Sequence, residues 1–395
     1  MFIRNFCLVS SPIFFQFRRN STNNILARTI RGIYKQTSSH LHTSLKNDGK
    51  GDGKASVVLL VKPEQMAKNI PSDSVLGKSS HVGIDVLNQM FKGNGTKIWN
   101  KTEETLEENN LHLNYRETKN ISDIEESDFV VIIDFNEIVN QLPKESPKML
   151  LNYEPSLMDS KAHEKSYQRQ FNKILTFLDK KENNSDLSTQ KYCYPVKRPE
   201  LKNLNSIPFA NRKLCCLIAT EKNNSHPGEL LYLRKTIVEY FNDRHPEDFE
   251  VYGRGWDHFP NVNKGLVDSK DKKIQEFKFV LCPENMELDG YITEKLFDAF
   301  SNGVVPIWQG PSNADDYISK NCYIDLREFS SPESLYNYIS NLTEEGWNVY
   351  RKNIKSYLKS EKSKCFTWKA FVTSFVQAIL TPISLRVSQN SLLTK

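Results

Sequence analysis

The densest group of residues that could do chemistry lies at residues 277–310, with the sequence FKFVLCPENMELDGYITEKLFDAFSNGVVPIWQG. This pattern predicts a strand, a polar loop, a helix and a second strand, and in an open α/β sheet such a loop lies in the crevice that binds ligands. Free N–H groups at the start of the helix and the ammonium group of Lys295 would suit a phosphate. The carboxylate of Glu294 would repel a phosphate, so it would instead accept hydrogen bonds from sugar hydroxyls. The alternative is that Thr293 caps the helix and Glu294 only complements the helix dipole.

The second half of the chain around this segment alternates strands with helices. Apolar residues spaced as in Leu230, Leu233, Ile237 and Phe241 predict an amphipathic helix, and a proline-containing stretch at residues 192–213 marks the connection from the first half. Such alternation is typical of a parallel sheet. The predicted strands are residues 214–219, 249–252, 277–282 and 304–308, and the predicted helices are residues 230–241, 291–300, 334–342, 346–358 and 368–380.

The first half shows the same alternation. The runs ASVVLLV at residues 55–61 and DFVVIID at residues 128–134 are typical of buried parallel strands. Further strands are predicted at residues 148–151 and 171–177, and HVGIDVLNQMF at residues 81–91 has helical spacing. The predicted fold class is therefore α/β, with two domains of similar size and a cleft between them, which is the usual place for a nucleotide-linked substrate.

The composition excludes several classes of protein. The chain has 395 residues, 38% of them hydrophobic, which is enough for two cores, and its net charge of +5 is spread along the sequence. A nucleic-acid-binding protein would cluster its basic residues, so nucleic acid is not an expected partner. None of the seven cysteines has zinc-ligand spacing, and Cys215, Cys216 and Cys282 read as small buried hydrophobes. The pair Asp315–Asp316 is the acidic start of a helix rather than a metal site.

The N-terminal residues predict two different destinations. Residues 6–17 are apolar with basic flanks, which suits a signal-peptide core or a weak membrane anchor. The first acidic residue is Asp48, and an Arg-rich, Ser-rich leader of this kind is also typical of a mitochondrial transit segment. A disordered basic stem is the third alternative, and KNDGKGDGK at residues 46–54 reads as a flexible linker.

The residues PEN followed by GYITEKLFDAFSNGVVPIWQGP closely resemble the signature of the α1,3/α1,4-fucosyltransferase family, glycosyltransferase family 10. The shared pattern is a strand, then EN, then Y-[IV]-T-E-K, then G-x-[VI]-P-[IV] and a glycine. It is long, gap-free and specific, and weaker similarity extends over residues 149–368. Two features depart from the family: Pro283 stands where many members have Phe, and the region before Met149 matches poorly.

Two weaker stretches are similar to the same family. LCCLIATEKNNSHP with Arg234 in the following helix resembles the strand-plus-arginine unit that opens the nucleotide domain, and FEVYGRGW resembles its strand and Gly-rich turn. The resemblance implies the GT-B architecture, in which two Rossmann-like α/β domains face each other across a cleft. The implied domains are an N-terminal segment at 1–54, an acceptor domain at 55–205, a GDP-fucose domain at 206–380 and a tail at 381–395.

The resemblance also implies site residues. Glu154, which follows the strand in MLLNYEPS, corresponds to a proposed base that faces the acceptor; a solvated glutamate before Pro155 is the alternative. Arg254 could face the pyrophosphate or could be an exposed turn residue. The donor-binding set carried over from the family and the turn is Arg254, Asn285, Tyr291, Glu294 and Lys295.

The activity implied by the resemblance is inverting transfer of L-fucose from GDP-fucose to a hydroxyl of a GlcNAc-containing glycan on a glycoprotein or glycolipid, with an α1,3-type linkage. No tightly bound metal or cofactor is expected, although a divalent ion could stimulate. Two other readings stay open: a GT-B transferase with another nucleotide sugar, and a non-catalytic glycan- or nucleotide-binding module. Family resemblance implies a type II Golgi membrane protein associated with the membrane through its N-terminus, whereas the leader composition indicates the mitochondrion.

Overall fold

The structure is a computed structural model, which describes residues 56–61, 90, 95–109, 111–117, 124, 128–179, 187–196, 207–223 and 226–393. All of these residues belong to one compact unit, Lys54–Lys395. The predicted leader at residues 1–54, most of the predicted helix at 81–91 and the predicted domain boundary at 205 and 206 lie outside the described residues. Within the described residues, no helix combines the length and the apolar character needed to cross a membrane.

A six-stranded parallel sheet forms the first half, in the order β2-β1-β3-β4-β5-β6. Both faces are buried, as the β-branched runs predicted: Val57 and Leu59 join the core on one face, and Val58 and Leu60 join the core on the other. The strands are β1 (Ser56–Val61), β2 (His112–Glu117), β3 (Phe129–Ile133), β4 (Lys148–Leu151), β5 (Lys173–Thr176) and β6 (Thr189–Lys191).

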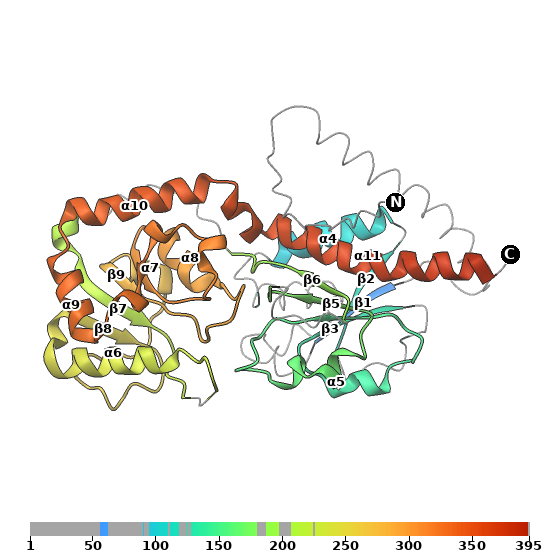
Figure 1. The fold of residues 1–395 in the computed structure, drawn as a ribbon, viewed down its shortest axis with the longest axis horizontal. Coiled ribbons are helices and arrows are strands. Elements are labelled where there is room, and N and C mark those ends of the chain that lie inside the picture. Colours follow the sequence, from blue (N-terminus) through green and yellow to red (C-terminus); the bar gives the residue numbers. More distant parts are fainter. Residues whose placement is uncertain are drawn as a thin grey trace, which may run out of the picture. The chain divides into compact units, whose positions relative to one another are not determined.

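Two helices from the first half of the chain pack near this sheet (Figure 1). Helix α4 (Gly95–Glu107) buries Ile98, Trp99 and Leu106, and short α5 (Lys165–Gln168) buries Tyr167. The four strands predicted in this half are present within three residues at each end, whereas β2, β6 and α4 were not predicted.

A five-stranded parallel sheet forms the second half, in the order β11-β10-β9-β7-β8. Cys215 and Leu217 point to one core and Cys216 to the other, so the prediction that these cysteines act as buried hydrophobes is confirmed. The strands are β7 (Lys213–Ile218), β8 (Phe249–Tyr252), β9 (Phe277–Leu281), β10 (Val305–Trp308) and β11 (Ile324–Asp325).

Three helices of the second half, α7, α9 and α10, start at a residue whose side chain caps them. The Ser331 side chain accepts from Ser334 N in a capping box, and the Thr343 side chain accepts from Gly346 N. The helices are α6 (Leu231–Arg244), α7 (Lys270–Ile274), α8 (Glu294–Ser301), α9 (Pro332–Asn341) and α10 (Glu344–Lys359).

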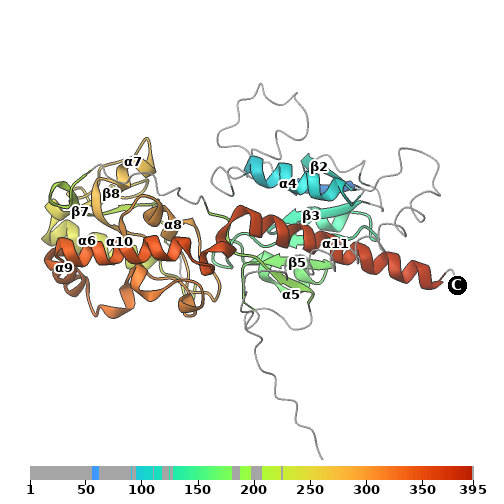
Figure 2. The same ribbon diagram turned by 90° about the horizontal axis from the view of Figure 1, so that it is seen from above.

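The last helix differs from its prediction. We predicted a helix at 368–380 within the second domain and a tail at 381–395, but α11 (Trp368–Leu393) continues through Pro382 and packs on the first sheet, beside α4 and β5 (Figures 1 and 2). The physical reason is its apolar face, which joins the core that also contains Val57 and Leu59. Its buried residues there are Phe371, Val372, Phe375, Val376, Ala378 and Ile379.

Candidate active site

A cavity of about 450 Å³ opens at the carboxyl ends of the strands and draws its walls from both halves of the chain. The first half contributes Tyr153, Glu154 and Tyr194. The second half contributes the ends of β7 and β9 and the residues that follow them, together with residues of α6, α7 and the first turn of α8. The prediction of a ligand crevice between two α/β domains therefore corresponds to a real cavity, with residues of both sheets facing one space.

Glu154 lies three residues after the end of β4 and reaches this cavity from the first half. Burial raises the pKa of its carboxyl above the ordinary value, while the positive charges of Lys295 and Lys222 act in the opposite direction and Glu294 adds to the rise. A partly buried carboxylate with a raised pKa, open to a cavity, has the properties of a general base. The alternative of a fully solvated side chain does not fit, since Glu154 is only partly exposed.

Glu284 organises the loop between β9 and α8, a role that sequence reasoning missed. Its side chain is fully buried, and one oxygen accepts from Thr293 N at 2.8 Å while the other accepts from the Thr293 hydroxyl at 2.7 Å and from Lys295 Nζ at 3.0 Å. The Thr293 side chain makes no capping hydrogen bond to α8. Instead, the Glu284 carboxylate accepts the backbone N–H of this N-cap residue. The Thr293 N–H is thus already bonded, and Lys295 supplies a positive charge to the cavity wall at this helix start.

Arg234 lies on α6 and lines the cavity with only 4% of its surface exposed. Its Nη2 donates to Pro283 O at 2.6 Å and to Asn285 Oδ1 at 3.0 Å, and its buried Nε has no hydrogen-bond partner. Burial lowers the pKa of this guanidinium, but an arginine remains charged at neutral pH. A buried cation with an unused donor beside a cavity is suited to an anionic ligand.

Tyr291 and Gly290 join the loop to the first half. The Tyr291 ring is buried 5.1 Å from Phe177 and lies 5.9 Å below Lys295 Nζ, and burial raises the pKa of its hydroxyl far above the ordinary value. Gly290 has φ +86°, and a Cβ there would meet Lys191 Nζ at 2.4 Å and Phe177 O at 2.5 Å. Only glycine permits this close approach, which brings the loop onto the first half.

Glu294 and two further lysines complete the polar wall. Glu294 begins α8 and lines the cavity, as does Lys270, whose Nζ lies 2.7 Å from Asp298 Oδ2. Lys222 reaches the cavity from the segment after β7. The sequence prediction named Glu294 and did not name either lysine: Lys222 lies in the stretch LCCLIATEKNNSHP, where only the strand and Arg234 were singled out, and Lys270 lies outside every motif that the sequence analysis used.

Arg254 is the one predicted donor-binding residue that the structure does not bring to this cavity. It is exposed on the turn after β8, and its carbonyl oxygen accepts from Glu221 N at 2.8 Å. The neighbouring Gly253 has φ +130°, and a Cβ there would lie 2.1 Å from Ala219 O. The glycines of this turn therefore serve close packing against the end of β7, and Arg254 lies exposed on the turn.

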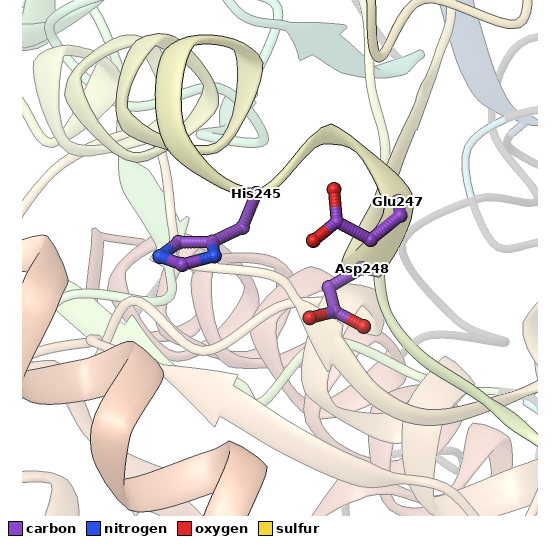
Figure 3. A group of neighbouring side chains, drawn as sticks. All are labelled: His245, Glu247 and Asp248. Carbon is purple, nitrogen blue, oxygen red and sulfur yellow. The ribbon is translucent and has the colours of Figure 1, made fainter.

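One group in the described part of the chain has a geometry that could hold a metal ion: His245, Glu247 and Asp248 (Figure 3). It follows α6 and precedes β8, so it lies at the amino end of that strand, away from the carboxyl ends where the cavity opens. The His245 ring stacks on Tyr336 at 3.8 Å, and the Tyr336 hydroxyl donates to Asp248 Oδ2 at 2.9 Å. These contacts join the end of α6 to α9, so packing between the two helices accounts for the proximity of the three side chains.

Comparisons with known proteins agree with this geometry. Residues 210–376 match the family model described as Glycosyltransferase family 10 (fucosyltransferase) C-term. The 4-galactosyl-N-acetylglucosaminide 3-alpha-L-fucosyltransferase 9 of Mus musculus is 30% identical over 163 residues, which cover 40% of this chain and 38% of that protein. The alpha-(1,4)-fucosyltransferase of Arabidopsis thaliana is 39% identical over 85 residues, 22% of this chain and 21% of that protein. The chain thus spans about two fifths or less of the length of these relatives.

Solved structures extend the likeness to both halves. A crystal structure of an alpha1,3-fucosyltransferase with GDP covers 88% of this chain and 96% of its own, with a TM-score of 0.50 and 13% identity. Another crystal structure of alpha1,3-fucosyltransferase gives a TM-score of 0.51 at 15% identity over 86% of this chain and 94% of its own. At such identities the likeness concerns the fold.

The two parallel α/β sheets with a cavity at their strand ends define the GT-B class of fold, as predicted. Within that class, residues 210–376 of the second half match the C-terminal model of glycosyltransferase family 10, the fucosyltransferase family, so the resemblance inferred from the segment Tyr291–Lys295 (YITEK) is confirmed.

Proposed function

We propose that the chain is an inverting fucosyltransferase, which moves L-fucose from GDP-fucose to a hydroxyl of a GlcNAc-containing glycan in an α1,3-type linkage. The observation that carries this proposal is the single cavity that holds Glu154 from the first half together with Glu294 and Lys295 from the second. The family match of residues 210–376 supports fucose as the transferred sugar.

The donor would occupy the wall formed by the second half. Lys295 and Arg234 suit the two phosphates, because one is a point charge and the other has an unused buried donor. Glu294 would accept hydrogen bonds from the ribose hydroxyls, and Asn285 and Tyr291 would lie beside the phosphates or the fucose. Arg254 has no part in this arrangement, since it lies outside the cavity wall.

The proposed reaction follows from the placement of Glu154 on the cavity wall of the first half and of Lys295 and Arg234 on the wall of the second half. Glu154 would take the proton of the acceptor hydroxyl as its oxygen forms a bond to the anomeric carbon of fucose. The bond from that carbon to the β-phosphate oxygen breaks on the opposite side, and GDP leaves with the electron pair. Lys295 and Arg234 would stabilise the charge that grows on the phosphate, where a single preorganised donor is typically worth roughly 10²–10³ in rate.

Cationic side chains would do here the work that a metal ion does in other transferases. Chelation by EDTA should therefore leave transfer intact, although a divalent ion could still stimulate it. Loss of activity that only Mn²⁺ restores would contradict this part of the proposal.

The test is transfer of labelled fucose by the full chain to a panel of GlcNAc-containing acceptors, with donor hydrolysis followed in parallel and GDP or UDP as competitor. We expect transfer that GDP inhibits and UDP does not. Inhibition by UDP alone would favour another nucleotide sugar. GDP binding without transfer or hydrolysis would favour a binding module, and neither binding nor turnover by folded protein would refute the assignment.

We further propose a Golgi location with the catalytic unit in the lumen and membrane association through the N-terminal residues, on the basis of family resemblance. A fluorescent fusion of the full chain tests this proposal, and a purely mitochondrial signal would replace it with the transit-segment reading of the leader.

A further inference from the structure

Asp134 stands directly after β3, at the strand end next to that of β4, and its backbone is unusual. Its φ is +53°, which makes it the one non-glycine residue with positive φ in the described part of the chain. Aspartate tolerates this left-handed region better than most residues, but the conformation still costs free energy. Strain of this kind tends to be retained where the surrounding structure uses it.

The Asp134 side chain holds the backbone on which Glu154 stands. Its Oδ1 accepts from Tyr153 N at 2.7 Å and from Glu154 N at 3.0 Å. Nineteen and twenty residues of sequence separate these partners, so the bonds join the loop after β3 to the loop after β4. Each of the two N–H groups follows the end of β4, where the sheet no longer supplies a partner for it.

Two more contacts complete this junction. Asp159, beyond Glu154 in the second loop, accepts from Phe135 N at 2.9 Å, so each loop supplies a carboxylate to the backbone of the other. The carbonyl oxygen of Glu154 lies 2.9 Å from His163 Nε2, and since a carbonyl only accepts, the ring nitrogen donates. Both polar backbone groups of Glu154 are thereby fixed, and its side chain is left to extend into the cavity.

The protonation state of the Asp134 carboxyl matters as well as its hydrogen bonds. The side chain is 1% exposed, and its Oδ2 is buried without a hydrogen-bond partner. Burial raises its pKa to about 8, against the bonds from Glu154 N and Tyr153 N and with smaller contributions from the Glu154 and Asp159 carboxylates. The other titratable groups that face it are the hydroxyls of Tyr153, Tyr167 and Tyr192. The raised pKa favours the neutral form of the Asp134 carboxyl, which adds less opposition to the ionisation of Glu154 than a second buried carboxylate would.

We propose that Asp134 is the positioning residue for the base: its carboxyl holds the Tyr153–Glu154 backbone so that the Glu154 carboxylate faces the acceptor hydroxyl. This inference rests on the proposed function, because it assigns a role to Asp134 only if Glu154 acts as the base. Positional errors of about 1 Å at a reacting group can cost roughly 10²-fold in rate.

Three substitutions separate this role from a structural one. Asp134→Asn keeps a neutral group with an oxygen that can accept from both N–H groups, so kcat should stay within about threefold of the wild-type value. Asp134→Glu keeps the carboxyl but moves it by one methylene, and Asp134→Ala removes it; both should lower kcat by about 10–100-fold. The Kd for GDP, measured calorimetrically, should change less than twofold in all three, because the donor wall belongs to the other half of the chain.

The matched control is Asp128→Ala at the opposite end of the same strand. Asp128 Oδ1 also accepts from a backbone N–H, that of Ser56 at 3.3 Å, but it does not line the cavity. This control should leave kcat near the wild-type value. Should Asp134→Ala fail to fold, the contrast between Asp134→Asn and Asp134→Glu carries the test.

The inference fails if Asp134→Glu retains wild-type kcat, if Asp134→Asn is as slow as Asp134→Glu, or if the Asp128 control loses as much kcat as the Asp134 variants. It also fails together with the proposed function if the wild-type chain binds no GDP or transfers no fucose. In contrast, transfer by the wild type with unaltered kcat in Glu154→Gln would remove the base and, with it, the role of Asp134, while leaving the donor assignment intact.

Discussion

The Glu284 carboxylate and the Lys295 ammonium group form an ion pair at 3.0 Å, in which the acid is wholly buried and the base is 19% exposed. The acid has all its partners inside the loop that starts α8, whereas the lysine has one side open to the cavity. Glu284 thus fixes the direction of Lys295 without approaching the ligand space itself. The same carboxylate stabilises the helix start, so it links the stability of α8 to the position of its cation.

Replacing Glu284 should lower the stability of the fold at α8 and should also disturb the position of Lys295. In Glu284→Ala the Thr293 N–H, the Thr293 hydroxyl and Lys295 all lose their buried partner, and we expect the free energy of unfolding to fall by about 1–3 kcal/mol. The affinity for GDP should fall as well, because Lys295 is no longer aimed at the cavity. Glu284→Gln keeps the bond from Thr293 N and should lose less stability. Urea unfolding and calorimetric titration with GDP measure the two effects, and unchanged GDP affinity in Glu284→Ala would separate Lys295 from the donor site.

Lys295 itself should matter for kcat. Lys295→Met removes the charge beside the leaving phosphate, and we expect kcat for fucose transfer to drop by roughly 10²–10³. Lys295→Arg should recover only part of this rate, since a guanidinium cannot take the place of the compact ammonium group between Glu284 and the cavity. The matched control is Lys272→Met on α7, which is exposed and does not line the cavity. Equal kcat in Lys295→Met and in this control would exclude Lys295 from the transition state.

We expect substitutions of Arg234 and of Arg254 to have different effects on the affinity for GDP. Arg234→Met should weaken GDP binding by at least tenfold, because it removes a buried cation from the cavity wall and frees Pro283 O and Asn285 Oδ1. Arg254→Met should leave the Kd for GDP within about twofold of the wild-type value, since its side chain is exposed on the turn after β8. A thermal scan checks that both variants are folded. The reverse order of Kd values would restore the sequence-based assignment of Arg254 to the pyrophosphate.

The contrast between these arginines shows where sequence reasoning succeeds and where it stops. The apolar runs of β1, β3, β7 and β9 predicted buried parallel strands, because a strand covered on both faces has to be apolar throughout. The edge strand β2 (HLNYRE) and the short β6 (TQK) are polar, and their pairing depends on neighbours far away in sequence. No local pattern distinguishes them from loops.

The site shows the same division. The candidate residues of the segment Thr293–Lys295 are consecutive in the sequence, so Glu294 and Lys295 were predicted, and both line the cavity. The turn with Arg254 resembled the Gly-rich turn of the family, yet the positive φ values of its glycines serve packing against the end of β7. The role of Asp134 and the packing of α11 on the first sheet had no local signal, because their partners lie in another loop and on another sheet.

The pH dependence of transfer should follow Glu154. A base must be ionised, so kcat falls as the pH drops through its pKa, and burial places that fall above the ordinary glutamate value of 4.5. The charge of Lys222 lowers this pKa, so Lys222→Met should move the acid limb to higher pH, and the displacement should shrink at high salt because Lys222 is exposed. Lys272→Met serves again as the control without displacement. An acid limb that moves to lower pH in Lys222→Met would contradict the assignment of this limb to Glu154.

The stability of the fold should report the protonation of Asp134. Its pKa is about 8 in the folded chain against 3.8 in the ordinary carboxyl, so the folded state binds more protons than the unfolded state between these values. The stabilisation by the neutral carboxyl is complete below about pH 4 and is lost as the pH rises through about 8. Asp134→Asn cannot ionise, so its melting temperature minus that of the wild type should increase from pH 5 to pH 8 and level off above that range. Differential scanning calorimetry over this range measures the difference, and a value that does not change with pH would show that Asp134 is already ionised in the folded protein at pH 5.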